Sequence, residues 1–167
     1  MKDCYNVLFV CTGNSARSLI AEALANSLGH GRLQAFSAGS KPAGRIHPQA
    51  KRLLQSTGLD TTGLRSKSWD EFSGPDAPVM DLIITVCDRA VGEACPVWPG
   101  HPLTAHWSVP DPGAASGSPE KVEKAFILAL HILRQRIALL LALRTEDLDR
   151  LALRTRLEQD PDPAANA

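Results

Sequence analysis

Residues 6–29 read NVLFVCTGNSARSLIAEALANSLG, and the fold follows from this stretch. Its beginning, together with Tyr5, forms the short apolar run YNVLFV (5–10), which is typical of a buried β-strand. After Arg17, apolar residues recur every four positions, as on one face of a helix: Ile20, Leu24 and Leu28. The stretch therefore predicts a strand that passes directly into a helix, with Cys11 and Arg17 on the turn between them.

The rest of the chain alternates in the same way between strand patterns and helical patterns. Strands are expected at 33–38, 81–86 and 103–109, and helices at 44–58, 66–72, 120–143 and 146–157. Near-continuous apolar strands separated by helices indicate a parallel sheet that is covered on both faces. We therefore expect an α/β fold, a single doubly wound domain whose four-stranded parallel sheet has the order 2-1-3-4, with helices on both faces.

The domain organisation follows from the same alternation. No internal repeat or linker interrupts it, so residues 1–158 are expected to form one domain. The last residues, 159–167, read QDPDPAANA and are expected to form a disordered polar tail.

The composition argues against several classes of function. The 18 basic and 18 acidic residues give a net charge of zero, so no broad basic surface for nucleic acid is expected. The apolar segment 125–143 carries His131, Arg134 and Arg136, which argues against a membrane span. The first apolar run is too short for a secretory signal. We therefore expect a cytoplasmic protein without a nucleic-acid or membrane partner.

The turn CTGNSARS (11–18) is suited to hold a tetrahedral oxyanion. Its backbone N–H groups can surround the anion, and the helix that follows adds the positive end of its dipole. The planar guanidinium of Arg17 can bind two oxygens of the anion at once. The expected substrate-binding residues are those of the turn: Thr12, Gly13, Asn14, Ser15, Ala16, Arg17 and Ser18.

Cys11 is expected at the floor of this anion cradle. The field that favours an anion also favours a thiolate, so the sequence predicts a lowered pKa for Cys11 and a nucleophilic sulfur. Ser18 can donate a hydrogen bond to that sulfur, and Asn14 can lock the loop. A cysteine that ends a buried strand is usually a small core residue. The spacing C-x5-R-S at a strand-to-helix turn nevertheless favours the catalytic interpretation.

The segment VLFVCTGNSARS resembles the low-molecular-weight protein tyrosine phosphatase superfamily and, within it, the thioredoxin-coupled arsenate reductases. The resemblance runs from Val7 to about Leu143 and includes FSAGSKPAGRIHPQA, SKSWDEF, DLIITVCDRAVGEACPVWPG and HWSVPDP. The turn CTGNSARS (11–18), called the P-loop below, is typical of the superfamily, and the later cysteines, Cys87 and Cys95, are typical of the reductase branch. The resemblance implies reduction of arsenate to arsenite without a bound cofactor. It also implies thioredoxin, or glutaredoxin with glutathione, as the reductant.

Cys87 and Cys95 distinguish reduction from hydrolysis, because reduction needs two electrons that thiols must supply. Cys87 directly follows the strand expected at 81–86. If that strand pairs with the strand expected at 5–10, the two strands lie roughly 5 Å apart. This spacing is close to the Cα separation of about 5.5 Å in a disulfide. A rearrangement can bring Cys95 to Cys87. We expect, as the resemblance also implies, a disulfide relay from Cys11 to Cys87 to Cys95 that an external dithiol regenerates.

Asp111, in VPDPG, is the candidate general acid. An Asp-Pro pair in a comparable place has this role in the superfamily, and a protonated carboxyl there needs a pKa raised by burial or by the nearby anion. No metal ion is predicted. Some reductases of this type bind potassium near the P-loop, and Glu22 and Ser37 match two of its ligands. Ser66 and Ser68 stand where acidic residues would be expected.

Two other functions remain open at this point. A small phosphotyrosine phosphatase would be a hydrolase and would not need Cys87 or Cys95. Against it, Ala16 replaces the second cysteine of the phosphatase loop, and Gly113 replaces an aromatic residue after the Asp-Pro pair. A non-catalytic thiol or oxyanion sensor would form the disulfide with peroxide and would not turn over arsenate. No role is assigned to Cys4.

Overall fold

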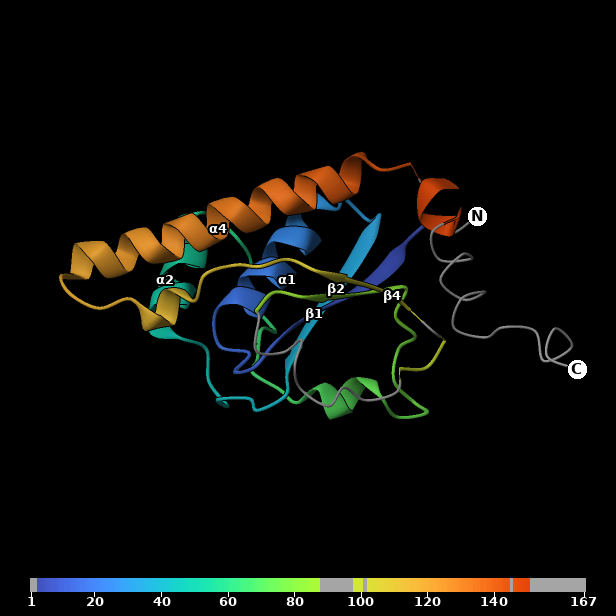
Figure 1. Ribbon diagram of the computed structural model, residues 1–167, viewed down its shortest axis with the longest axis horizontal. Helices are drawn as coiled ribbons and strands as arrows, with labels where there is room; N and C mark the ends of the chain where they lie inside the picture. The colour runs from blue at the N-terminus through green and yellow to red at the C-terminus, as the bar shows by residue number, and fades with distance from the viewer. Residues whose placement is uncertain (1–2, 88–97, 101, 145, 151–167) are drawn as a thin grey trace, which may run out of the picture.

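The computed structural model describes residues 3–87, 98–100, 102–144 and 146–150. One four-stranded sheet runs through it in the order β2-β1-β3-β4. The strands are β1 (Tyr5–Cys11), β2 (Leu33–Gly39), β3 (Leu82–Thr85) and β4 (Leu103–His106). Every neighbouring pair is parallel, so the predicted α/β sheet and its strand order are confirmed (Figure 1).

Helical segments lie on both faces of this sheet, as predicted, with α-helices on one face and a short 3-10 helix on the other. On one face, α1 (Arg17–Leu28) packs against β2 and against α4 (Pro119–Ala142), and α4 also contacts α2 (Pro48–Ser56). On the other face lies the 3-10 helix η1 (Trp69–Phe72), where the Phe72 ring contacts the Phe36 ring of β2 at 5.6 Å. Figure 1 shows α4 spanning one side of the molecule and η1, the short green helix, on the opposite side. Within the described residues, the second face is thus covered by a single 3-10 turn and loops.

The helix boundaries reflect local chemistry. At the start of α4, Ser118 caps the helix by accepting from Lys121 N, and Pro119 occupies the first helical position. At the start of α2, His47 Nδ1 accepts from Gln49 N. The residue before α1 makes no side-chain cap bond. The first turn of α1 therefore adjoins the P-loop without a capping side chain between them.

The apolar segment 125–143, part of the helix expected at 120–143, makes up most of α4. By length and composition α4 passes the test for a membrane-spanning helix. Its buried side chains instead join the core that surrounds β1 and α1: Phe126, Ala129, Leu130, Leu133 and Ile137. The interruption of the segment by polar residues, noted in the sequence, matches a helix with one buried side and one exposed side.

The carboxyl ends of the strands bring three separate segments to one edge of the sheet. Cys11 ends β1, Cys87 lies two residues after β3, and Asp111 follows β4. This edge is where ligands bind in open α/β sheets. Some predictions lie outside the described residues. They concern Cys95, the second half of the helix expected at 146–157, the domain end at 158 and the tail 159–167.

Candidate active site

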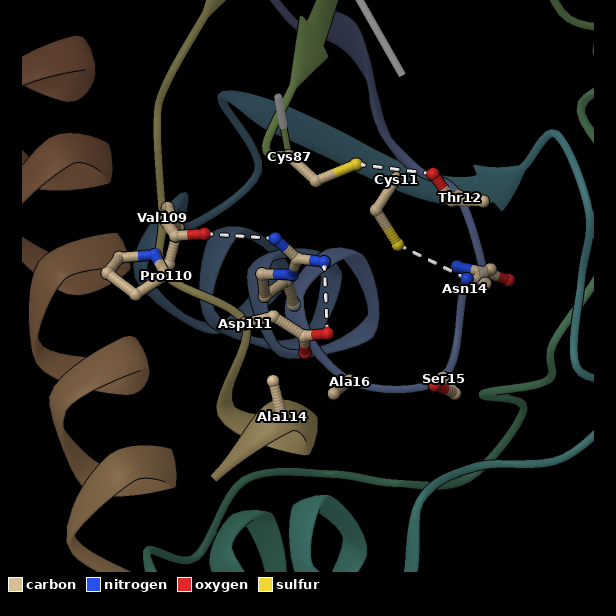
Figure 2. A pocket seen from close by; sticks show the side chains of 12 residues that line it. Cys11, Thr12, Asn14, Ser15, Ala16, Cys87, Val109, Pro110, Asp111 and Ala114 are labelled. Atoms are coloured by element: carbon tan, nitrogen blue, oxygen red, sulfur yellow. Dashed lines mark hydrogen bonds and ion pairs between the residues drawn. The ribbon is translucent and has the colours of Figure 1, made fainter. Parts of the chain in front are cut away.

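A cavity of about 580 Å³ opens at this edge and contains most of the predicted site residues. It is lined by Cys11, Thr12, Gly13, Asn14, Ser15, Ala16, Arg17, Cys87, Val109, Pro110, Asp111 and Ala114. Figure 2 shows the P-loop curving around one side of it, with Cys87 and the loop of Val109 on the other. Ser18 is fully buried beneath the loop and does not line the cavity.

The P-loop backbone is oriented from behind by the segment 40–47. Four loop carbonyls accept hydrogen bonds from this segment: Cys11 O from Ser40 N, Thr12 O from Lys41 N, Gly13 O from Ala43 N, and Ser15 O from His47 N. In a planar trans peptide the N–H points opposite to the C=O. These bonds therefore turn the N–H groups of Thr12, Gly13, Asn14 and Ala16 away from the segment. The arrangement is that of an anion-binding nest.

Gly39 allows the end of β2 to lie in close contact with the P-loop backbone. A Cβ at position 39 would lie 2.5 Å from Thr12 O and 3.0 Å from Asn14 N, which no real side chain tolerates. Because β2 ends in a glycine, its carboxyl end can approach the P-loop closely enough for the bonds of segment 40–47 to form.

The Cys11 sulfur is almost completely buried and receives several hydrogen bonds. Asn14 N donates to Sγ at 3.2 Å, and Ser18 Oγ lies 2.9 Å from it. Burial raises the pKa of Cys11, while the hydrogen bonds from Ser18 and Asn14 lower it and the neighbouring Cys87 raises it. The net direction is upward, which corrects the lowered pKa predicted from the sequence. The sequence showed the anion-favouring field but not the desolvation of a sulfur at the end of a fully buried strand.

Replacing Ser18 with alanine is expected to shift the reactivity of Cys11 to higher pH. The hydroxyl lowers the pKa of Cys11, so its loss raises that pKa further and reduces the thiolate fraction at pH 7. A hydrogen bond to a charged group contributes about 1.5–3 kcal/mol, which corresponds to a shift of about one to two pH units. Iodoacetamide alkylation of the Cys11 peptide, followed by mass spectrometry across a pH series, measures the shift. The control is Ser27→Ala on the exposed end of α1; an unchanged profile in Ser18→Ala would contradict the prediction.

Arg17 connects the P-loop to the loop that follows β4. Its NH1 donates to Val109 O at 3.0 Å, and its NH2 lies 3.8 Å from Asp111 Oδ2. Asp111 Oδ1 accepts from Gly113 N, which orients the carboxylate through its own turn. The Asp111 side chain is 50% exposed, so the burial considered as one source of its protonation is not found.

The two cysteines that the structure describes at this edge are Cys11 and Cys87. They lie at the ends of neighbouring strands and line the same cavity. Cys87 Sγ is 3.6 Å from Thr12 Oγ1, and Cys87 and Cys11 are both buried (Figure 2). The structure thus brings Cys11, Arg17, Cys87 and Asp111 together in one cavity.

Sequence reasoning missed two groups at the site. The carbonyl of Val109 holds Arg17, but a backbone acceptor leaves no mark in a sequence. Lys67 is buried, and its backbone N donates to Asn14 Oδ1 at 2.9 Å. Its ammonium lies 3.8 Å from Glu22 and 3.5 Å from Ser37, the two residues compared above with potassium ligands. A lysine between two serines at the start of the short helix expected at 66–72 is normally exposed, so no sequence signal indicated this contact.

The family model for low molecular weight phosphotyrosine protein phosphatases matches residues 6–150 of the chain. The chain belongs to this family, as the strand order and the P-loop geometry already indicated.

Within this family, the chain is similar to several proteins that are named arsenate reductases. The chain is 33% identical to the "Glutaredoxin arsenate reductase" of Synechocystis sp. over 110 residues, which are 66% of this chain and 80% of that protein. It is 33% identical to the "Arsenate reductase" of Bacillus subtilis over 115 residues, 69% of this chain and 79% of that one. The crystal structure of arsenate reductase from Archaeoglobus fulgidus superposes with a TM-score of 0.64 at 33% identity, covering 82% of this chain and 99% of that one.

Proposed function

We propose that this protein reduces arsenate to arsenite. The observation that carries the proposal is that two thiols, Cys11 and Cys87, line one anion-binding cavity together with Arg17. Hydrolysis of a phosphate ester needs the nucleophile, the anion cradle, a general acid and a water molecule, but no second thiol. A second thiol beside the nucleophile is what a two-electron reduction adds. The named activities of the relatives support the same reaction.

Arsenate is a better match to this cavity than a phosphotyrosine side chain. The inward N–H groups of the P-loop and the guanidinium of Arg17 would hold its oxygens, with the arsenic above the Cys11 sulfur. Among the lining residues that the structure describes, none is aromatic, so nothing there would stack on a phenol ring. Small tetrahedral oxyanions remain as the substrate class.

The first chemical step forms a bond between sulfur and arsenic. The Cys11 thiolate attacks arsenic(V), and one arsenate oxygen leaves as water after it is protonated. Asp111 is the proposed donor of that proton, because its carboxylate lies beside Arg17 at the mouth of the cavity.

The second step transfers two electrons. The Cys87 thiolate attacks the Cys11 sulfur, and the bond between sulfur and arsenic breaks with its electron pair remaining on arsenic. Arsenic leaves as arsenite in the +3 state, and the two thiolates are oxidised to a Cys11–Cys87 disulfide. Cys95 is then proposed to attack Cys87, which frees Cys11 and leaves a Cys87–Cys95 disulfide.

An external dithiol would reduce that last disulfide and complete the cycle. Thioredoxin is our first choice, because the Cys87 and Cys95 arrangement resembles the thioredoxin-coupled branch. Glutaredoxin with glutathione is the alternative, and the name of the Synechocystis relative favours it. A relay that depends on free thiols also fits the reducing cytoplasm, where we propose that the protein works.

Phosphatase activity is the second candidate function. The P-loop with Cys11 and Arg17 would bind phosphate as well as arsenate, since the two anions share geometry and charge. We therefore expect slow hydrolysis of p-nitrophenyl phosphate beside arsenate reduction.

The deciding experiment measures arsenate-dependent NADPH consumption by the purified protein. One series contains thioredoxin and thioredoxin reductase, and a parallel series contains glutaredoxin, glutathione and glutathione reductase. Turnover in either series supports the proposal and identifies the donor. No turnover in either, together with hydrolysis of p-nitrophenyl phosphate, would assign the protein to the phosphatases. No activity in any assay, with disulfide formation by peroxide, would favour the sensor.

A further inference from the structure

A buried ion pair lies behind the P-loop and does not line the catalytic cavity. Lys67 Nζ is 3.8 Å from Glu22 Oε1, and the two side chains are 7% and 10% exposed. The ammonium also donates to Arg65 O at 3.0 Å and to Ser37 Oγ at 3.5 Å. Burial raises the pKa of Glu22 and lowers that of Lys67, and each charge opposes the shift of the other. The Lys67 ammonium is therefore held by three groups: the Glu22 carboxylate, the Ser37 hydroxyl and the Arg65 carbonyl.

The backbone of the same lysine contacts the P-loop. Lys67 N donates to Asn14 Oδ1 at 2.9 Å, and Lys67 O accepts from Gly39 N at 2.9 Å. Asn14 is fully buried and has a φ of 44°, a left-handed conformation that asparagine tolerates better than most residues. One residue thus joins the ion pair to the side chain in the middle of the loop.

This backbone bond determines which way the Asn14 amide points. Because Lys67 N–H needs an acceptor, Oδ1 faces Lys67 and Nδ2 faces Ser18, whose Oγ is 2.7 Å away. A hydroxyl that accepts from Asn14 keeps its own proton for the Cys11 sulfur at 2.9 Å. With the amide reversed, Ser18 would donate to Asn14, and the sulfur would lose that donor.

We infer that Lys67 is a positioning residue, whose buried ammonium, held by Glu22, keeps Asn14 oriented so that Ser18 donates to the Cys11 sulfur. Stability alone is a weak reason for such a pair, since the desolvation of two buried charges offsets most of their attraction. The inference rests on the proposed role of Cys11 as the nucleophile. Its test uses alkylation of the sulfur, so it does not depend on whether arsenate is reduced.

Nearby charges also influence the reactivity of Cys11, and the test must distinguish their effect from that of the orientation of Asn14. Cys87, Arg17 and Asp111 line the cavity around the Cys11 sulfur, and Arg65 and Glu71 lie near the ion pair. Because Glu22 and Lys67 carry opposite charges, neutralising both leaves the local net charge unchanged. A change in Cys11 reactivity in that double variant therefore does not arise from a change in local net charge.

The experiment compares the pH profile of Cys11 alkylation in the wild type, Lys67→Met and the double variant Glu22→Gln/Lys67→Met. Iodoacetamide is the probe, and the Cys11 peptide is quantified by mass spectrometry. We expect both variants to react about 10-fold more slowly at pH 7, with the profile shifted upward by about one pH unit. The profile of Ser18→Ala is the reference for complete loss of the donor.

Thermal unfolding, measured on the same samples, separates position from stability. The neutral double variant leaves no unpaired buried charge, so it is the one that tests the inference if Lys67→Met does not fold. The matched control is Glu71→Gln, which breaks the exposed Arg65–Glu71 pair beside the same segment and is expected to leave the profile unchanged. A folded double variant whose profile coincides with that of the wild type would overturn the inference.

Discussion

The Cys11→Ser variant is expected to lose both arsenate reduction and any hydrolysis of p-nitrophenyl phosphate. A serine hydroxyl is not ionised at neutral pH and cannot form a disulfide, so both the attack on arsenic and the electron transfer stop. Removal of a covalent nucleophile lowers kcat by about 10⁶-fold in a well-studied hydrolase. The NADPH-coupled assay and the release of p-nitrophenol measure the two activities.

Two controls accompany this variant. Cys4→Ser makes the same substitution at an exposed thiol and should leave both activities unchanged. Serine at position 11 can keep bonds to Ser18 and Asn14, so the circular dichroism spectrum should match that of the wild type. Residual turnover of either substrate by the folded variant would exclude Cys11 as the nucleophile.

The Cys87→Ser variant is expected to separate reduction from hydrolysis. Steady-state arsenate reduction should disappear, because Cys87 is the thiol proposed to displace arsenic from the Cys11 sulfur, and no other described cysteine lines the cavity. Hydrolysis of p-nitrophenyl phosphate should persist, because the P-loop and Arg17 are untouched. Thr12 Oγ1 can bond to the new hydroxyl as it does to the sulfur, so the loop should keep its shape.

The same variant should also change the rate of Cys11 alkylation slightly, and the direction of this change tests whether Cys87 lies close to Cys11. Cys87 raises the pKa of Cys11, so its replacement should leave the alkylation of Cys11 at pH 7 unchanged or slightly faster. Continued arsenate turnover in Cys87→Ser would contradict the relay. Loss of both activities with slower alkylation would instead show that the substitution had damaged the P-loop.

Much of the fold and site could be predicted because the signals are local. The run ending at Cys11 and the helical pattern after Arg17 give a strand-to-helix turn without reference to other segments. Alternation of strands and helices then gives a parallel sheet, and the connection rules leave few strand orders. For the same reason, Cys87 could be placed at the sheet edge from its position directly after a strand.

Interactions between distant segments were beyond that reasoning. The raised pKa of Cys11 depends on how completely α1, β2 and β3 cover the end of β1, which no short motif encodes. The exposure of Asp111 depends on a turn that its own side chain caps.

The sequence alone is sufficient for the order of the strands and for the strand-to-helix turn that forms the P-loop, and it predicts which thiols react. The folded chain adds which donors reach the Cys11 sulfur and what holds them. Lys67 and Asn14 are 53 residues apart, and the bond between them forms only when the chain packs behind the P-loop. Local patterns follow from the rotation and rise of each element, whereas burial and hydrogen-bond direction depend on all the elements that meet at one point.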